Sequence, residues 1–207
     1  MIYTFYSFKG GVGRSMALAN VAESFSVEGL RVVIVDWDLE APGIENFFFS
    51  SGAEVELVQS QLGLLDMLLA YQKRLPGFLS SQRANHAAET SGESSFSDQL
   101  EEWLPPVSTW LYPIRSGEAG QLALLTAGWR NGNRFASYAE AVRRFDWADF
   151  YVSYRGEDYF NWLRRQLESV ADVVLIDSPT GVSHVARICA HKLRMLSSFF
   201  VLPICKT

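Results

Sequence analysis

The chain has few cysteines and no long apolar run, and both shortages narrow the class of protein. Two of its 207 residues are cysteines, Cys189 and Cys205, which is too few for a disulfide framework and favours a reducing compartment. The late apolar run from Phe199 to Cys205 is far shorter than the ~20 residues of a transmembrane helix. The first residues lack the basic region and cleavage site of a secretory signal. We therefore expect a cytoplasmic protein with no membrane span.

Basic charge is also scarce. The chain carries 18 Lys and Arg against 23 Asp and Glu, for a net charge of -5. No overall positive field draws a nucleic-acid backbone, so nonspecific DNA binding is not indicated, although a local basic patch would permit it. The 3 histidines show no metal-ligand spacing with the cysteines, which argues against zinc. A composition of 48% hydrophobic and 20% charged residues is typical of one globular domain, expected here over residues 1–207.

The start of the chain has the pattern of a strand, a loop, a helix and a second strand. Ile2 to Tyr6 is β-branched and aromatic, and the glycine-rich loop from Lys9 to Gly13 follows it. A helical repeat of apolar residues begins at Ser15 and ends near Gly29. The aliphatic run Leu30 to Val35 predicts a strand buried on both faces. This βαβ unit places the loop at the carboxyl end of a strand, where open α/β sheets bind their ligands.

The remaining pattern alternates between helix and strand. It predicts helices over residues 63–71, 138–145, 159–170 and 183–193, and strands over residues 121–126, 172–177 and 198–203. Residues 80–97, rich in Ser, Ala, Glu and Gly, predict a mobile loop inside an irregular insertion at about 47–120. The whole predicts a three-layer α/β fold, with a mostly parallel sheet flanked by helices.

The glycine-rich loop has the chemistry of a phosphate site without the strict Walker A pattern. That pattern needs a glycine where Phe8 stands and a lysine where Arg14 stands. Glycines at positions 10, 11 and 13 nevertheless let main-chain N–H groups turn toward an anion, and the loop opens onto the positive end of a helix. Ser15 follows, where a hydroxyl would coordinate magnesium, although a polar residue is also common at a helix N-terminus.

Three aspartates follow predicted strands at the same edge of the sheet. Asp36 and Asp38 end or follow the second strand, and Asp177 ends a later one. A single aspartate after a strand is most often a turn or capping residue. Three at one edge, beside a phosphate loop, predict a site for a metal-bound triphosphate.

Three segments resemble the signature elements of one ATPase family. K-G-G-V-G-R-S from Lys9, D-W-D-L-E-A-P-G from Asp36 and V-V-L-I-D-S-P-T-G from Val173 resemble the deviant Walker A, switch I and Walker B elements of ParA/MinD ATPases, P-loop proteins of the SIMIBI class. F-D-W-A-D-F-Y at residues 145–151 is similar to a segment of a subgroup with the same motifs. The resemblance runs from Met1 to about residue 200 and is loose between residues 47 and 120.

The resemblance implies an ATP site and a partner. The loop and first helical turn would bind the nucleotide through Lys9, Gly10, Gly11, Val12, Gly13, Arg14, Ser15 and Met16. Lys9 would be catalytic, reaching across a nucleotide-sandwich homodimer to the other copy's phosphates, so that dimerisation depends on ATP. An unidentified effector protein would receive the output.

The resemblance also implies a magnesium site. Ser15 would coordinate the ion, Asp177 would hold it through a water, and Asp36 would support the metal. Asp38 would orient the attacking water beside the metal and act as the second catalytic residue. Phosphoryl transfer of this kind needs positioning and charge neutralisation rather than a covalent nucleophile.

The chain departs from the family pattern in three places. Arg14 replaces the usual loop lysine with a planar guanidinium, which predicts binding with slow hydrolysis. Pro179 stiffens the segment after Asp177 and removes an amide donor. ParA-type domains continue past the last predicted strand, so the resemblance implies a fold incomplete at its C-terminus, with base-contacting residues unassigned.

Two other interpretations stay open. The same scaffold supports ATP-dependent synthetases or kinases of the dethiobiotin synthetase and cobyrinate amidation type, whose acceptor pocket would fall within residues 47–120. A non-catalytic module that binds nucleotide or a partner is the third. The sequence does not fix ATP over GTP.

Overall fold

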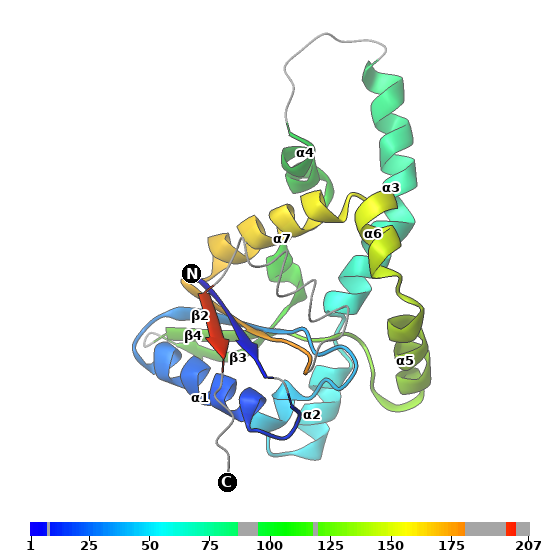
Figure 1. Cartoon of the computed structure of the whole chain (residues 1–207). Helices are drawn as coiled ribbons and strands as arrows, with labels where there is room; N and C mark the ends of the chain where they lie inside the picture. Colours follow the sequence, from blue (N-terminus) through cyan, green and yellow to red (C-terminus); the bar gives the residue numbers. More distant parts are fainter. Residues whose placement is uncertain (8, 87–94, 118–119, 181–197, 202–207) are drawn as a thin grey trace.

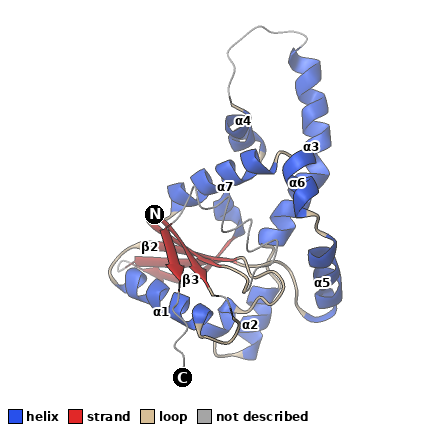
Figure 2. Cartoon of the chain, viewed as in Figure 1, coloured by secondary structure: helices blue, strands red, loops and turns tan. Residues whose placement is uncertain are grey.

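The computed structural model describes residues 1–7, 9–86, 95–117, 120–180 and 198–201. Within these ranges a six-stranded sheet in the order β3-β4-β2-β5-β1-β6 forms the centre of the fold (Figures 1 and 2). The strands are β1 (Ile2–Tyr6), β2 (Arg31–Asp36), β3 (Leu111–Gly117), β4 (Gly120–Leu125), β5 (Val173–Asp177) and β6 (Ser198–Val201). Every neighbouring pair is parallel except β3 with β4. The mostly parallel sheet predicted from the sequence is confirmed.

Helices cover both faces of this sheet. They are α1 (Arg14–Val27), α2 (Gly52–Gln59), α3 (Leu64–His86), α4 (Phe96–Trp103), α5 (Phe135–Arg144), α6 (Trp147–Ser153) and α7 (Gly156–Val170), with 3-10 turns η1 (Ile44–Phe47), η2 (Val107–Trp110) and η3 (Gly132–Arg134). The α1 helix lies on one face and α7 on the other (Figure 2). The chain therefore has the three layers that its pattern predicts.

The alternation of side chains along β2 explains why both faces need a cover. Val32 and Ile34 belong to the core on the α1 side, whereas Val33 and Val35 belong to the core on the other side. Successive residues of a strand point to opposite faces, so an unbroken aliphatic run must be buried on both.

Among the helices of the described ranges, we find none whose length and apolar content would let it span a bilayer.

The region predicted to be irregular is mostly regular where it is described. Residues 47–120 contain α2, α3, α4 and β3. The mobile loop predicted over residues 80–97 is wrong at both ends, because α3 continues to His86 and α4 begins at Phe96. Residues 87–94 and the helix predicted over 183–193 lie outside the described residues. The sequence composition misled here because Phe78 and Leu79 anchor α3 to the core well beyond the predicted end of that helix at Tyr71.

Helices α3, α4, α6 and α7 lie partly beyond the sheet (Figure 1), and aromatic side chains extend the core into them. The ring of Tyr71 lies 5.8 Å from that of Phe150 and 4.5 Å from that of Tyr159. Phe78 stacks on Trp103 with ring centroids 4.3 Å apart. Such pairs add to the stabilisation from burial alone. The helices beyond the sheet are therefore packed on one another and continuous with the main core.

The start of α3 is pressed against the end of β4, with no room for a side chain at Gly63. Leu64 N donates to the Thr126 carbonyl at 2.8 Å. The Asp66 carboxylate accepts from Gly63 N at 3.0 Å and from Trp129 N at 2.9 Å. A Cβ added at Gly63 would lie 2.1 Å from the Thr126 carbonyl oxygen. The main chain at Gly63 therefore packs directly against the main chain at Thr126.

We predict that Gly63→Ala lowers the free energy of unfolding by about 1–3 kcal/mol or more, because the added methyl forces main chain apart in a packed core. Gly77→Ala is the matched control. Gly77 lies within α3, whereas Gly63 directly precedes it, and a Cβ at Gly77 meets nothing within 4 Å. Alanine there should therefore stabilise the helix by about 0.5–1 kcal/mol. Urea denaturation measures both, and equal stability of the two variants would contradict the packing at this junction.

Candidate functional site

The glycine-rich loop leaves β1 and enters α1 with the helix N-terminus uncapped. Gly11 and Gly13 have φ of 73° and 79°, left-handed conformations that glycine adopts without strain. Gly13 is the N-cap of α1 and offers no side chain, and the first turn of α1 holds no acidic residue. The N–H groups of that turn have no intrahelical acceptor, and the helix dipole favours an anion beside them. The loop is therefore built to receive one.

Arg14 bridges two of the three predicted aspartates. Its Nε donates to Asp177 Oδ1 at 2.6 Å, and its Nη2 donates to Asp38 Oδ2 at 2.9 Å. The side chains of Arg14 and Asp177 are 6% and 3% exposed. Charge-assisted hydrogen bonds of this length, shielded from water, are the strong class of such contacts. The residue at the loop lysine position is thus turned toward carboxylates.

Ser15 and the ends of two strands complete the cluster. The Ser15 hydroxyl donates to Asp177 Oδ2 at 2.6 Å, so both oxygens of this carboxylate are engaged. Trp37 N donates to the Asp177 carbonyl at 2.9 Å. Asp36 and Asp177 are partners in the register of β2 and β5. The sheet itself therefore brings the carboxylates together.

The donor set fits a nucleotide with its magnesium. Arg14 Nη1 is buried without a hydrogen-bond partner among the described residues, so this guanidinium has an unused donor suited to a phosphate oxygen. The Ser15 hydroxyl and the Asp177 carboxylate are oxygen ligands of the kind that magnesium accepts alongside water. The described residues hold no group of three His, Cys, Asp or Glu arranged to bind a metal ion by themselves. Phosphate oxygens and waters would have to complete the shell.

Asp36 lies behind this cluster with a different partner. It is 1% exposed, and neither of its carboxylate oxygens has a hydrogen-bond partner among the described residues. Arg130 Nη2 is 4.0 Å from Asp36 Oδ2 and 2.7 Å from Glu45 Oε2. Glu45 also accepts from Gln59 Nε2 at 2.9 Å. A second buried arginine thus faces a second pair of acids.

Burial disfavours the charged forms of Asp36, the last residue of β2, and of Asp38. It raises the pKa of Asp36 well above its ordinary value, and the nearby Asp177 carboxylate raises it further while Arg130 lowers it. Burial also raises the pKa of Asp38, although hydrogen bonding and charge attraction from Arg14 oppose the change. Positive charge is therefore in deficit at this edge of the sheet.

Lys9 lies apart from the cluster. Its side chain is exposed and forms no ion pair with the described residues, while its carbonyl accepts from the Ser7 hydroxyl at 3.0 Å. Val12 and Met16 are 43% and 53% exposed. The loop therefore presents a cation and two apolar side chains outward.

The predicted site residues separate into three groups. Arg14, Ser15, Asp38 and Asp177 meet, Asp36 lies behind them, and the loop residues 9–13 and Met16 lie at the surface. Sequence reasoning missed Arg130 and Glu45. Neither belongs to a motif, and their contact joins residues far apart in the chain, so no local pattern signalled them.

Comparison with known proteins also indicates a nucleotide-binding domain. The family model described as the CobQ/CobB/MinD/ParA nucleotide-binding domain matches residues 3–194. No curated protein sequence matches the chain.

Solved structures share the fold at low sequence identity. A ParA family ATPase from Chlorobium tepidum is 20% identical with a TM-score of 0.53, covering 97% of this chain and 59% of its own. Protein DIP2308 from Corynebacterium diphtheriae is 18% identical with a TM-score of 0.50, with 97% and 59% covered. The chain therefore spans less than two thirds of the length of these proteins.

We predict that Asp36→Asn stabilises the nucleotide-free protein at neutral pH relative to the unmodified chain. The raised pKa means that the folded state holds the Asp36 proton more tightly than the unfolded state. This contribution to stability is complete below the unfolded pKa and is lost as pH rises through the folded pKa. The asparagine has no such loss. Urea midpoints from pH 4 to pH 8 should diverge with rising pH, and a constant or shrinking difference would contradict an acid whose charge is disfavoured.

Proposed function

The chain belongs to the CobQ/CobB/MinD/ParA nucleotide-binding domain family, and from this premise we propose that it is an ATP- and Mg-binding ATPase that dimerises with its nucleotide and hydrolyses it slowly. The proposal is carried by the meeting of Arg14, Asp38 and Asp177 beside the uncapped start of α1. This combination offers amide donors for phosphate and carboxylates for a metal within one small volume.

Each residue of the cluster has a part in this proposal. The main-chain N–H groups of residues 10–16 would bind phosphate oxygens, and Ser15 and Asp177 would hold a magnesium ion, Asp177 through a water. An ion held there would supply positive charge to offset the charge on the phosphates. Asp38 orients the attacking water by accepting a hydrogen bond from it. Asp36 supports the metal site from behind Asp177, without contacting the ion.

Arg14 gives the physical reason for slow turnover. Its guanidinium is always charged, and it is held by Asp38 and Asp177 in a buried site. Its free Nη1 could donate one hydrogen bond to a phosphate, but a bidentate contact needs a second donor, and Nε and Nη2 are held by Asp177 and Asp38. To make that contact Arg14 must leave one of these two carboxylates. The free energy of breaking these pairs adds to the cost of reaching a productive arrangement.

Lys9 suits a role at a second copy of the chain. Its exposed side chain carries a charge with no described partner, next to Val12 and Met16, which are apolar and exposed. A lysine that reached across to the other copy's phosphates would make dimerisation depend on nucleotide. This dependence is the switch, and an effector protein would respond to it.

We predict that Lys9→Ala removes ATP-dependent dimerisation. Light scattering after size-exclusion chromatography should give a dimer for the unmodified chain with a nonhydrolysable ATP analogue and magnesium, and a monomer with ADP or no nucleotide. The variant should stay monomeric in all three conditions while its stability is unchanged, because the side chain is exposed.

Lys73→Ala is the control for this experiment, since Lys73 is an exposed lysine on α3, away from the loop. It should dimerise like the unmodified chain. An unmodified chain that remains monomeric at saturating nucleotide and magnesium would refute the dimerisation switch, whatever the variants do.

We also predict that basal turnover lies below ~1 per second, low for enzymes, and that Arg14→Lys raises it. An ammonium cannot direct separate N–H groups to two carboxylates as a guanidinium does. If release became easier by ~1 kcal/mol, turnover would rise about fivefold. The variant should also melt at a lower temperature without nucleotide, because one buried ion pair is lost.

Phosphate release under saturating ATP measures this effect, and thermal melting without nucleotide confirms that the pairs existed. Turnover of Arg14→Lys at or below the unmodified rate would contradict the inhibitory role of Arg14. Nucleotide binding without hydrolysis over hours, in both proteins, would favour a non-catalytic module instead.

One observation supports a second candidate, transfer to a small-molecule acceptor. A cavity of about 730 Å³ lies beside the loop that carries Asp38. Leu39 and Glu40 line one side, and α5 residues with Trp147 line the other. The acceptor pocket would then use residues 135–147 rather than the segment 47–120 expected from the sequence. Release of ADP that depends on an added acceptor would distinguish this activity from simple hydrolysis.

A further inference from the structure

Arg130 closes the two ends of the loop that carries Asp38. This loop begins at Asp36, the last residue of β2, and runs to Glu45 in η1. Arg130 Nη2 lies 4.0 Å from the Asp36 carboxylate and 2.7 Å from the Glu45 carboxylate. One guanidinium therefore spans the base of the loop, while Asp38 stands between the two acids in sequence.

Arg130 is itself held from three directions. Its Nη1 donates to the Gly128 carbonyl at 3.1 Å, and its main-chain N donates to the Gln59 carbonyl at 2.8 Å. Gln59 in turn donates from its side chain to Glu45 at 2.9 Å. Arg130 is 4% exposed and Glu45 is 0% exposed. Water does not compete with these contacts, and the arginine cannot swing away without leaving buried acids unpaired.

We propose that Arg130 is a positioning residue, which fixes the loop of residues 36–45 so that Asp38 is held at the distance from Arg14 and Asp177 that the site requires. The role rests on the proposed function, because Asp38 matters only if water is oriented there. Arg130 touches neither substrate nor metal in this scheme and acts through the loop alone.

The loop has other restraints, because Trp37 N donates to the Asp177 carbonyl at 2.9 Å and the side chains of Trp37, Leu39 and Ile44 are buried. Within the loop, Leu39 N donates to the Trp37 carbonyl, and Ala41 N donates to the carbonyl and to the carboxylate of Asp38. From outside the loop, Tyr138 donates from its hydroxyl to the Leu39 carbonyl at 2.9 Å. Loss of the Arg130 clamp would free the end of the loop at Glu45 and leave the middle held by this hydrogen bond, the Arg14 contact and the buried Leu39 side chain. We therefore expect its amides to open more often.

The test is amide hydrogen exchange without nucleotide, followed by turnover with ATP. In Arg130→Met, peptides covering residues 36–47 should exchange faster by about tenfold or more, because local opening becomes easier. Turnover should fall by about 10–100-fold, the usual cost of losing a residue that orients a catalytic group, with KM for ATP within about threefold. Arg130→Lys should recover part of both, since it restores the charge but not the fork of donors.

A second variant separates positioning from an unpaired buried charge. Arg130→Met alone leaves Glu45, and the more distant Asp36, without this cation, which by itself destabilises a protein. Arg130→Met combined with Glu45→Gln removes both charges of the closer pair and keeps an acceptor for Gln59. We expect this double variant to fold stably and still to show fast exchange over residues 36–47 and low turnover. Recovery of both to the unmodified values would overturn the proposal.

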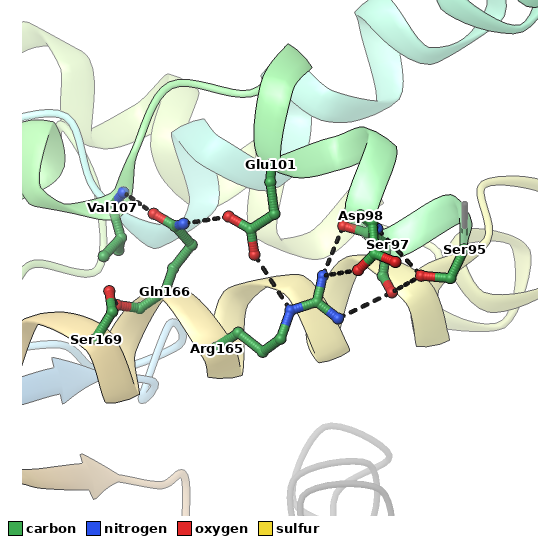
Figure 3. A network of polar contacts seen from close by, with 8 residues as sticks. All are labelled: Ser95, Ser97, Asp98, Glu101, Val107, Arg165, Gln166 and Ser169. Carbon is green, nitrogen blue, oxygen red and sulfur yellow. Dashed lines mark hydrogen bonds and ion pairs between the residues drawn. The ribbon is translucent and has the colours of Figure 1, made fainter. Parts of the chain in front are cut away.

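Arg165 provides a control elsewhere in the fold (Figure 3). This arginine of α7 donates to the Ser97 carbonyl at 2.7 Å, to the Ser97 hydroxyl at 3.0 Å and to Glu101 at 3.2 Å. Arg165 therefore holds α4 in place, much as Arg130 holds the loop of residues 36–45, but it lies away from the site of Arg14, Asp38 and Asp177. Arg165→Met should speed exchange in residues 95–107 and leave both residues 36–47 and turnover unchanged. Slow turnover in this variant would show that general destabilisation, not positioning, lowers activity.

The two proposals fail in different ways. If the unmodified chain neither binds nor hydrolyses ATP, the proposed function is wrong, and the exchange data alone still decide whether Arg130 fixes the loop. If it hydrolyses ATP and Arg130→Met matches its exchange and kcat, the proposed function survives and the positioning role is wrong.

Discussion

The shortage of positive charge at the carboxyl edge of the sheet is the constraint on which the rest of the site depends. Four buried acids, Asp36, Asp38, Glu45 and Asp177, face two buried arginines. If every acid were ionised, the cluster would carry two uncompensated negative charges. Burying such charges is costly. The raised pKa of Asp36 and Asp38 is the response of the isolated protein to this cost.

The shortage follows from the way a parallel sheet is built. Strands β1, β2 and β5 run in one direction, so their carboxyl ends meet, and the aspartates that end β2 and β5 stand side by side in register. Both faces of the sheet are covered, so these acids cannot turn to water. A divalent cation with phosphate oxygens is a chemically suited way to satisfy carboxylates at such an edge. The architecture thus creates the demand that the nucleotide site would meet.

The sequence predicts those parts of the site that local pattern controls. The aspartates at strand ends, the glycines of the loop and Ser15 follow from strand periodicity and turn chemistry, and the contact of Ser15 with Asp177 agrees with that placement. The direction of the Arg14 side chain was not predictable, because a guanidinium fits phosphate and carboxylate equally well. The pairing of Arg130 with Glu45 depends on how the segment after β4 packs against η1 and the end of α2. A contact of this kind is set by tertiary packing.

The difference between local pattern and tertiary packing also explains which helices were not predicted from the sequence. The end of α3, S-S-Q-R-A-N-H over residues 80–86, and much of α4 are polar, and a polar composition predicts loops. Aromatic contacts such as Phe78 on Trp103 hold them. Packing between helices outweighs the local preference for a loop when enough apolar area is buried, and the composition of one segment does not reveal how much area it will bury.

Arg14 links the charge balance of the site to the order in which metal and nucleotide would bind. An arginine cannot be released by losing its proton, because its pKa lies far above the physiological range. Release from Asp38 and Asp177 therefore requires another cation to take its place. A phosphate that took Arg14 from both carboxylates would leave two acids unpaired, whereas magnesium arriving with it would supply the missing positive charge. Under the proposed function, this charge balance would favour joint arrival of metal and nucleotide.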